Sequence, residues 1–143
     1  MTLHVGFTGT SSGLTGPQTT ALISLIGALP MDVEAHHGDC VEADATFDRL
    51  CAEACIMRHA HPGHGRNGSS PKRAYCEAED IRESLPYLTR NRNIVACSDM
   101  LIACPRGPER QRGSGTWYTI RRAAEKGIQI TIVWPDGTVE ELT

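Results

Sequence analysis

The sequence lacks a long apolar run, a large net charge and a leader segment. No apolar stretch approaches the ~20 residues that cross a bilayer, so a membrane protein is not expected. The net charge is only −3 over 143 residues, whereas an electrostatic nucleic-acid binder needs a basic stripe that displaces counterions from phosphates. Residues Met1 to His4 lead directly into a strand-like segment, without the basic and apolar regions of a signal peptide. We therefore expect a cytoplasmic protein that binds neither membranes nor nucleic acids.

The sequence also has no Cys-x-x-Cys pair among its six cysteines. A disulfide framework with this many cysteines suits a much shorter secreted chain, so we expect reduced thiols that act mostly as small buried hydrophobic groups. His59, His61 and His64 are close in sequence, but no nearby set of cysteines completes four zinc ligands at a usual spacing. The sequence therefore predicts no bound metal and no cofactor.

What the sequence does contain is an alternation of short apolar runs with longer amphipathic segments. The apolar runs predict strands at residues 3–7, 32–36, 55–58, 100–104 and 128–134. The segments between them have helical periodicity, including one that begins at Pro17, one from Pro86 to about Cys97 and one that ends at Gly127. This alternation is typical of α/β proteins. We expect residues 1–143 to form a single Rossmann-like domain, with a five-stranded, mostly parallel sheet and helices on both faces.

Small and polar residues follow four of the predicted strands. They are Thr8, Gly9 and Thr10; His37, Gly38 and Asp39; His61; and Gly113, Ser114, Gly115 and Thr116. Open α/β sheets bind ligands beyond the carboxyl ends of their strands. Glycines let the backbone approach a ligand, and free amides at a helix N-terminus attract a phosphate. Each loop alone could be an ordinary cap or turn, but together they predict a ligand that contains a phosphate.

Five short segments of the chain also occur together, in the same order and at similar spacings, in one known superfamily. They are Gly6–Thr10, His37–Cys40 with Ala43–Asp44, Pro86–Leu88 with Arg90–Arg92, Ser98–Ala103, and Gly113–Trp117. In this set the chain resembles the SLOG superfamily, which includes the Lonely Guy (LOG) phosphoribohydrolases, the Smf/DprA proteins and small stand-alone bacterial or phage proteins. The resemblance covers nearly the whole chain. It implies one SLOG-like domain that holds a nucleotide-derived ligand and often forms a homodimer or larger assembly.

The resemblance also implies roles for single residues. Gly113 to Thr116 look like the loop and helix start that hold a phosphate in LOG-type proteins, and Gly9 and Thr10 resemble the loop under the ligand. Arg90 and Arg92 resemble a helix start that supplies a cation. LOG enzymes carry a glutamate three residues after the threonine of the glycine-rich motif, whereas this chain has Thr119 there. Cleavage of an N-glycosidic bond passes through a sugar cation that a carboxylate stabilises, so this replacement favours binding over hydrolysis.

Two functions follow from this interpretation. The first is a protein that binds a nucleotide-derived small molecule, such as an ADP-ribose derivative or a nucleoside phosphate, and so senses or sequesters a signalling nucleotide. The second is a LOG-like phosphoribohydrolase, or another hydrolase or transferase at an N-glycosidic bond. In such an enzyme Asp39 and Asp44 are the candidate catalytic carboxylates.

Several of these residues have a purely structural alternative. Asp39 and Glu42 match a capping box, and Asp44 suits a first helical turn because of the helix dipole. Arg90 and Arg92 could be solvated helix charges. The apolar stripe of Trp117, Ile120 and Ala124 offers either a core face or a surface for a two-fold partner, and the second alternative predicts self-association.

Overall fold

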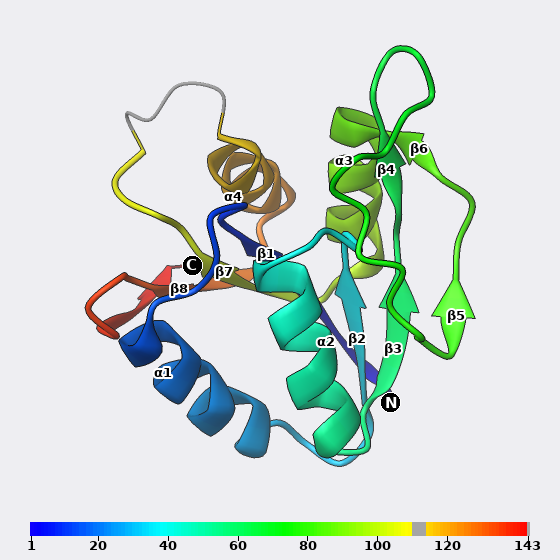
Figure 1. The fold of residues 1–143 in the computed structure, drawn as a ribbon. Helices are drawn as coiled ribbons and strands as arrows, with labels where there is room; N and C mark the ends of the chain where they lie inside the picture. The colour runs from blue at the N-terminus through cyan, green and yellow to red at the C-terminus, as the bar shows by residue number, and fades with distance from the viewer. Residues whose placement is uncertain (110–113, 143) are drawn as a thin grey trace.

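The computed structural model describes residues 1–109 and 114–142, which form a seven-stranded sheet with a helical layer on each side (Figure 1). In spatial order the strands are β5 (Asp80–Ile81), β3 (Met57–Ala60), β2 (Val33–His37), β1 (Leu3–Gly9), β7 (Met100–Cys104), β8 (Gln129–Val133) and β9 (Val139–Leu142). Neighbouring strands pair in parallel except β8 and β9, which are antiparallel. Two short strands, β4 (Gly63–His64) and β6 (Leu85–Pro86), form a separate parallel pair.

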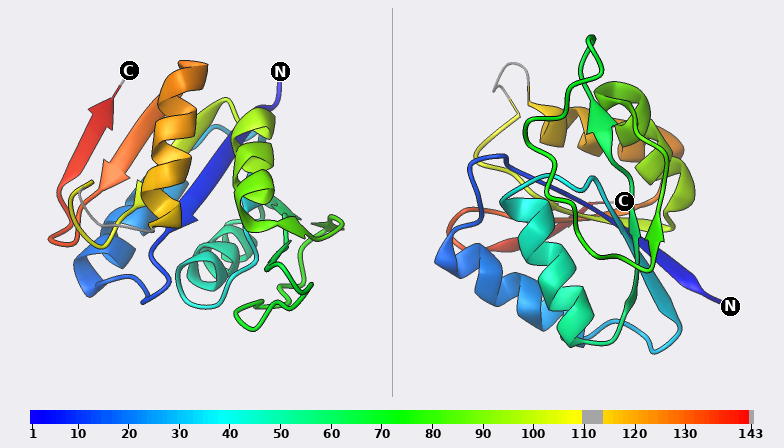
Figure 2. Two further views of the ribbon diagram at one scale, coloured as in Figure 1. Left: turned by 90° about the horizontal axis from the view of Figure 1, so that it is seen from above. Right: turned by 45° about the vertical axis from the view of Figure 1, so that its right-hand side comes forward.

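Two helices cover each face of the sheet (Figures 1 and 2). The helices α1 (Gly16–Gly27) and α2 (Ala43–Glu53) lie on one face, and α3 (Tyr87–Cys97) and α4 (Gly115–Lys126) lie on the other. Phe7 of β1 and Phe47 of α2 stack with ring centroids 4.3 Å apart at the centre of the first core. Trp117 and Ile120 of α4 pack on β7 and β8 in the second. Burial of each such side chain contributes about 1.5–3 kcal/mol.

The order of the strands fixes where a ligand can bind. From β1 the chain proceeds outward through β2 and β3 to β5, and it then returns to the other side of β1 to form β7 and β8. The strand order therefore reverses between β1 and β7. In open α/β sheets the crevice beyond the carboxyl ends of the strands at such a reversal is the usual ligand site. Here this crevice opens between the N-termini of α2, α3 and α4.

The fold confirms the Rossmann-like class and adds detail that the periodicity did not show. The fourth predicted strand has the observed bounds, whereas the third begins at Met57 rather than Cys55, because residues 54 and 55 belong to the turn that ends α2. The sheet also has two edge strands that were not predicted. The short β5 lies between the third predicted strand and the helix predicted from Pro86, and β9 pairs through residues whose side chains alternate little in polarity.

The structure corrects two interpretations of helical residues. Asp39 and Glu42 form no capping box, because Glu42 precedes α2 with a φ of 73° and no side chain caps that helix. In α4, Trp117 and Ile120 are buried against the sheet, while Ala124 is exposed rather than facing inward. Trp117 and Ile120 therefore belong to the core, and self-association stays a prediction. Among the described helices, none combines the length and apolarity that a membrane span requires.

Candidate functional site

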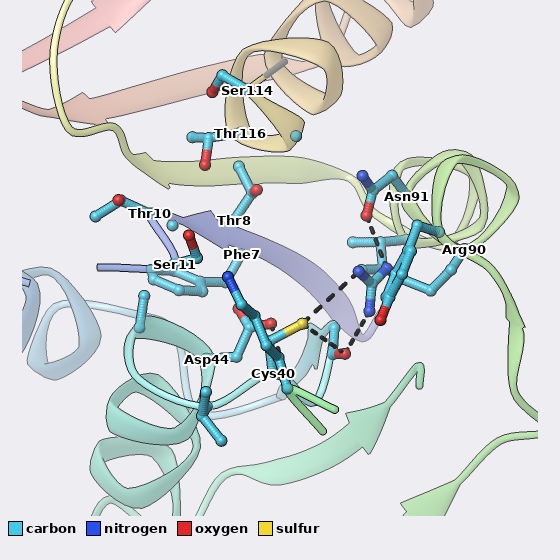
Figure 3. Close-up of a pocket in the computed structure, with 18 of the residues that line it drawn as sticks. Phe7, Thr8, Thr10, Ser11, Cys40, Asp44, Arg90, Asn91, Ser114 and Thr116 are labelled. Atoms are coloured by element: carbon cyan, nitrogen blue, oxygen red, sulfur yellow. Dashed lines mark hydrogen bonds between the residues drawn. The ribbon is translucent and has the colours of Figure 1, made fainter. Parts of the chain in front are cut away.

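A cavity of about 690 Å³ occupies the crevice beyond β1 and β7 (Figure 3). Its walls come from the loop after β1, the loop and first turn of α2, the N-terminal half of α3, and the start of α4. This volume lies within the usual range for small-molecule sites. The predicted residues that line it are Thr8, Gly9, Thr10, Gly38, Asp44, Arg90, Ser114, Gly115 and Thr116.

One end of the cavity is formed by the N-terminus of α4. Ser114 is the N-cap, and its hydroxyl accepts a hydrogen bond from the Trp117 amide at 3.2 Å. The first amides of a helix have no acceptor within the helix. The Ser114 hydroxyl is the acceptor for the Trp117 amide, and no described group accepts a hydrogen bond from the amides of Gly115 or Thr116. Together with the positive end of the helix dipole, these amides form a place for an anion.

The loop after β1 faces this helix start across the cavity, as Figure 3 shows. Thr10 Oγ1 and Ser12 Oγ are 2.8 Å apart, and Thr10 Oγ1 also accepts from the Ser12 amide, so the loop is held by its own hydroxyls. At Gly9 an added Cβ would come within 2.6 Å of the Ala43 side chain, the first residue of α2. Glycine is therefore required here because the loop and α2 pack without room for a side chain.

Arg90 forms the wall opposite the β1 loop. Its guanidinium donates to the carbonyl oxygens of Gly38 and His61, and its Nε donates to Asn91 Oδ1 at 2.7 Å. The side chain is only 6% exposed, so these bonds replace water around a buried cation. Arg90 thus joins the ends of β2 and β3 to α3 while it contributes positive charge to the cavity. Arg92, two residues further along α3, is exposed and does not line the cavity. Its guanidinium donates to the hydroxyl of Thr89.

Asp44 is the one carboxylate among the residues that line the cavity. Its Oδ2 accepts from the Cys40 amide at 3.2 Å, and the side chain is almost completely buried. Burial raises the pKa of Asp44, although His37, Arg90 and the Cys40 amide oppose this shift. A raised pKa favours the protonated form of a carboxyl group, and that form can donate a hydrogen bond or act as a general acid.

Asp39 lies outside the cavity lining, although it follows β2 directly. Its carboxylate accepts from Arg73 Nε at 3.0 Å and from the Cys76 amide at 2.8 Å, and it is 1% exposed. The Asp39 carbonyl also accepts from the Ala74 amide. These bonds hold residues 72–76 beside α2, and the Lys72 side chain lines the cavity as a result.

His37 and His61 are also placed away from the cavity. His37 Nδ1 accepts from the Asp39 amide, and its Nε2 lies 2.8 Å from Asp48 Oδ1, which leaves neither nitrogen for a ligand. His61 Nε2 lies 2.9 Å from His36 Nδ1. Thr119 is 1% exposed, and its hydroxyl donates to the Gly115 carbonyl at 2.9 Å, within its own helix. Gly113 lies outside the described residues.

Sequence analysis missed several residues that the fold brings to the cavity. They are Ser11, Cys40, Val41, Ala43, Lys72, Tyr87, Leu88, Asn91, Ile94 and Arg106. Asn91 stands beside Arg90 and could have been found from that neighbour. Lys72 had no signal, because it lies in a polar segment without periodicity, far from every strand end in sequence.

Comparison with known proteins identifies this fold. No model of a known protein family matches the chain, and no curated protein matches its sequence. The structure of DNA processing protein A (DprA) from Streptococcus pneumoniae is similar, with a TM-score of 0.70, 18% identity and coverage of 92% of this chain. The chain spans 50% of that DprA structure.

A second similar structure is the molybdenum cofactor binding protein from Rippkaea orientalis. It has a TM-score of 0.71 and 14% identity, and the match covers 94% of this chain and 77% of that one. At these identities the likeness concerns the fold. The strand order and these two neighbours together show that the chain has a SLOG-type Rossmann-like fold.

Proposed function

We propose that this protein binds a nucleotide-derived small molecule in the cavity, with a phosphate at the start of α4. The observation that carries the proposal is the pair of amides, Gly115 and Thr116, at a helix N-terminus that lines the cavity. Three cations, Lys72, Arg90 and Arg106, line the same cavity, against the single carboxyl group of Asp44 among its described lining residues. This balance of charge favours an anionic ligand.

The size and the remaining walls suit a nucleoside attached to the phosphate. Beside the polar groups, the cavity is lined by Phe7, Leu88 and Ile94, and by the ring of Tyr87. Apolar and aromatic surface of this kind can cover a base, while a few polar groups fix its orientation. An ADP-ribose derivative or a nucleoside phosphate has this combination of parts. Sequestration or sensing of a signalling nucleotide would need only this binding.

The test has two steps. Mass spectrometry of small molecules released on denaturation of the purified protein should detect a phosphorylated nucleotide derivative. Calorimetry should then compare adenosine monophosphate and ADP-ribose with adenosine, which lacks the phosphate. We expect adenosine to bind at least about ten-fold more weakly, a difference of about 1.4 kcal/mol. Equal affinity for adenosine and its monophosphate would contradict a phosphate site.

The second candidate function is cleavage of an N-glycosidic bond, and Asp44 supports it. This residue is a buried carboxyl group with a raised pKa on the cavity wall, whereas Asp39 is fully engaged by Arg73 and Cys76. Overnight incubation with nucleoside monophosphates and ADP-ribose, followed by chromatography, measures free base. We expect none. Base release that is lost in Asp44→Asn but retained in Arg92→Gln would instead make the protein an enzyme.

A further inference from the structure

Four of the six histidines lie together at the sheet and come from three separate segments of the chain. The cluster contains His4 of β1, His36 of β2 and His59 of β3, together with His61, which follows β3. The last residue of α3, Cys97, lies beside them. In Figure 1 α3 lies on the side of the sheet where it contacts β1 and β2. Of these residues, none lines the cavity described above.

Two of these histidines and the cysteine are close enough to share one ion. The facing nitrogens His36 Nδ1 and His61 Nε2 are 2.9 Å apart. Cys97 Sγ completes a group in which one donor atom from each residue lies within 4.8 Å of the other two. The imidazole rings of His36 and His61 are tilted by 49° relative to each other, so their in-plane lone pairs can converge between the rings. Two imidazoles and a thiolate are ligands that zinc and similar transition metals prefer.

Two of the three donor residues, His36 and Cys97, also contact a further group. Arg82 donates to Cys97 Sγ at 3.3 Å, and His36 Nε2 lies 2.9 Å from His4 Nδ1. Asp80 Oδ2 accepts from Arg82 Nε at 3.2 Å and so fixes that guanidinium. Metal-binding residues typically have such outer partners, which orient the ligand atom before the ion arrives.

Two other groups of side chains in the described structure have similar spacing but less suitable chemistry. His4, His36 and His59 lie close together, but the rings of His36 and His59 stack at only 8°, so their in-plane lone pairs cannot meet on one ion. In the group of His37, Asp48 and Cys76, the backbone amide of Asp39 donates to His37 Nδ1, and Asp48 is already paired with Arg58 at 2.7 Å.

We propose that His36, His61 and Cys97 bind one divalent transition-metal ion of the zinc type, with a fourth position left for water. The ion would join the end of β3 to the C-terminus of α3 and to β2, and so stabilise this side of the sheet. His4 and Arg82 act as positioning residues. The site is separate from the nucleotide cavity, and its test does not depend on ligand binding there.

The experiment uses Co²⁺ as a spectroscopic probe on the full chain, freed of metal with a chelator that is then removed. A thiolate ligand gives Co²⁺ a charge-transfer absorption band that histidine and carboxylate ligands do not. We expect saturation at one Co²⁺ per chain with this band, displacement of Co²⁺ by Zn²⁺, and a higher melting temperature with Zn²⁺.

Three cysteine variants locate the ion. Cys97→Ser should lose the band and bind Co²⁺ at least about ten-fold more weakly. Cys76→Ser tests the rival group, and Cys55→Ser, an exposed cysteine outside all three groups, is the matched control. Both should retain the band. His4→Gln should keep the band but weaken binding.

Three results would overturn the proposal. They are no Co²⁺ binding by the wild-type chain, a band that survives in Cys97→Ser, or a band that disappears in Cys76→Ser instead. Circular dichroism of each metal-free variant separates loss of the site from loss of the fold. If Cys97→Ser were unfolded, Cys97→Ala and the His4→Gln affinity would decide the question by the same criteria.

Discussion

Asp39, Asp44 and Arg90 all stand near strand ends, yet the fold gives each of them a different neighbourhood. Asp39 accepts bonds from a distant loop, Asp44 is buried on the cavity wall, and Arg90 joins two strands to a helix. In the sequence, all three residue types indicate a catalytic or ligand-binding role equally strongly. Of the three, only Asp44 and Arg90 line the cavity, whereas the Asp39 carboxylate is bound by Arg73 and by the Cys76 amide.

At Gly115 we expect a single charge to abolish anion binding. A Cβ at this position would meet only Asn91 Nδ2, at 3.6 Å, so a side chain fits without disturbing the fold. Gly115→Asp places a carboxylate beside amides that face the ligand, which reverses the favourable electrostatics. Gly115→Asn has the same size without the charge and is the control. Calorimetry with adenosine monophosphate should show at least about ten-fold weaker binding for Asp than for Asn. Equal affinities would exclude this end of the cavity as the phosphate site.

At Thr119 we expect a loss of stability rather than a direct effect on the ligand. The side chain is buried within α4 and lies outside the cavity lining, so a glutamate there would bury a charge without a partner. Thr119→Glu should lower the free energy of unfolding by about 3 kcal/mol, and Thr119→Ser, which keeps the hydroxyl, by about 1 kcal/mol. Urea titration measures both. A stable Thr119→Glu variant with weakened phosphate binding would instead mean that this position faces the ligand.

At the scale of elements, the segment between β4 and β5 contains no helix or strand and is tied to other parts of the chain by hydrogen bonds. Val41 donates to the Lys72 carbonyl at 2.7 Å, Ala74 donates to the Asp39 carbonyl, and the Asp39 carboxylate binds Arg73 and the Cys76 amide. These bonds pair the segment with the chain just before α2. Lys72 of this long loop thereby reaches the lining of the cavity.

Asp39→Asn should loosen this segment without unfolding the sheet. Asparagine tolerates the left-handed conformation of Asp39 but loses the ion pair with Arg73. We expect faster tryptic cleavage after Lys72 and Arg73 and a loss of about 2 kcal/mol in the free energy of unfolding. Arg49→Gln removes an exposed pair with Glu53 and serves as the control, because such pairs contribute little. Identical cleavage rates in both variants would show that Asp39 does not anchor the segment.

At the scale of the whole molecule, the histidine cluster makes stability depend on pH. Burial lowers the pKa of His36 and of His61 from 6.5 to about 3, with nearby histidines and Arg82 adding to the shift. Above pH 6.5 both residues are neutral in the folded and unfolded chains. Below it the unfolded chain binds protons that the folded chain does not, so the free energy of unfolding falls as the pH falls from 6.5 towards 3.

Urea titrations between pH 7.5 and 5 measure this dependence in metal-free protein with a chelator present. Two such groups give a slope of up to about 2.7 kcal/mol per pH unit below 6.5. His61→Asn removes one of them and should reduce the slope to about half. The range stops at pH 5 because Asp48 and Asp80, whose ion pairs lower their pKa values despite burial, add to the effect in more acidic solution. A flat profile from pH 7.5 to 5 would show that these histidines are not buried as neutral groups.

The sequence by itself determined the class of the fold and most of its elements. Apolar runs with few charges become the central parallel strands, because both faces of those strands are covered. Ser114 and Gly127 mark the ends of α4, since a hydroxyl cap and a left-handed glycine are local requirements. The glycine and threonine residues after β1 and at the start of α4 indicate the cavity for the same reason. Each of these signals depends only on near neighbours in the chain.

Tertiary structure decided which of the candidate residues named from the sequence lie close together. Lys72 reaches the cavity because its carbonyl accepts from the Val41 amide and its neighbours bind Asp39. The side chains of His37, His61 and Thr119 bond instead to Asp48 of α2, to His36 of β2 and to the Gly115 carbonyl within α4. The edge strands β5 and β9 depend on backbone pairing, which leaves little trace in side-chain periodicity. The group of His36, His61 and Cys97 arises from the register of β2 and β3 and the packing of α3. Register and packing are properties of the assembled sheet, so no local pattern in the sequence contains them.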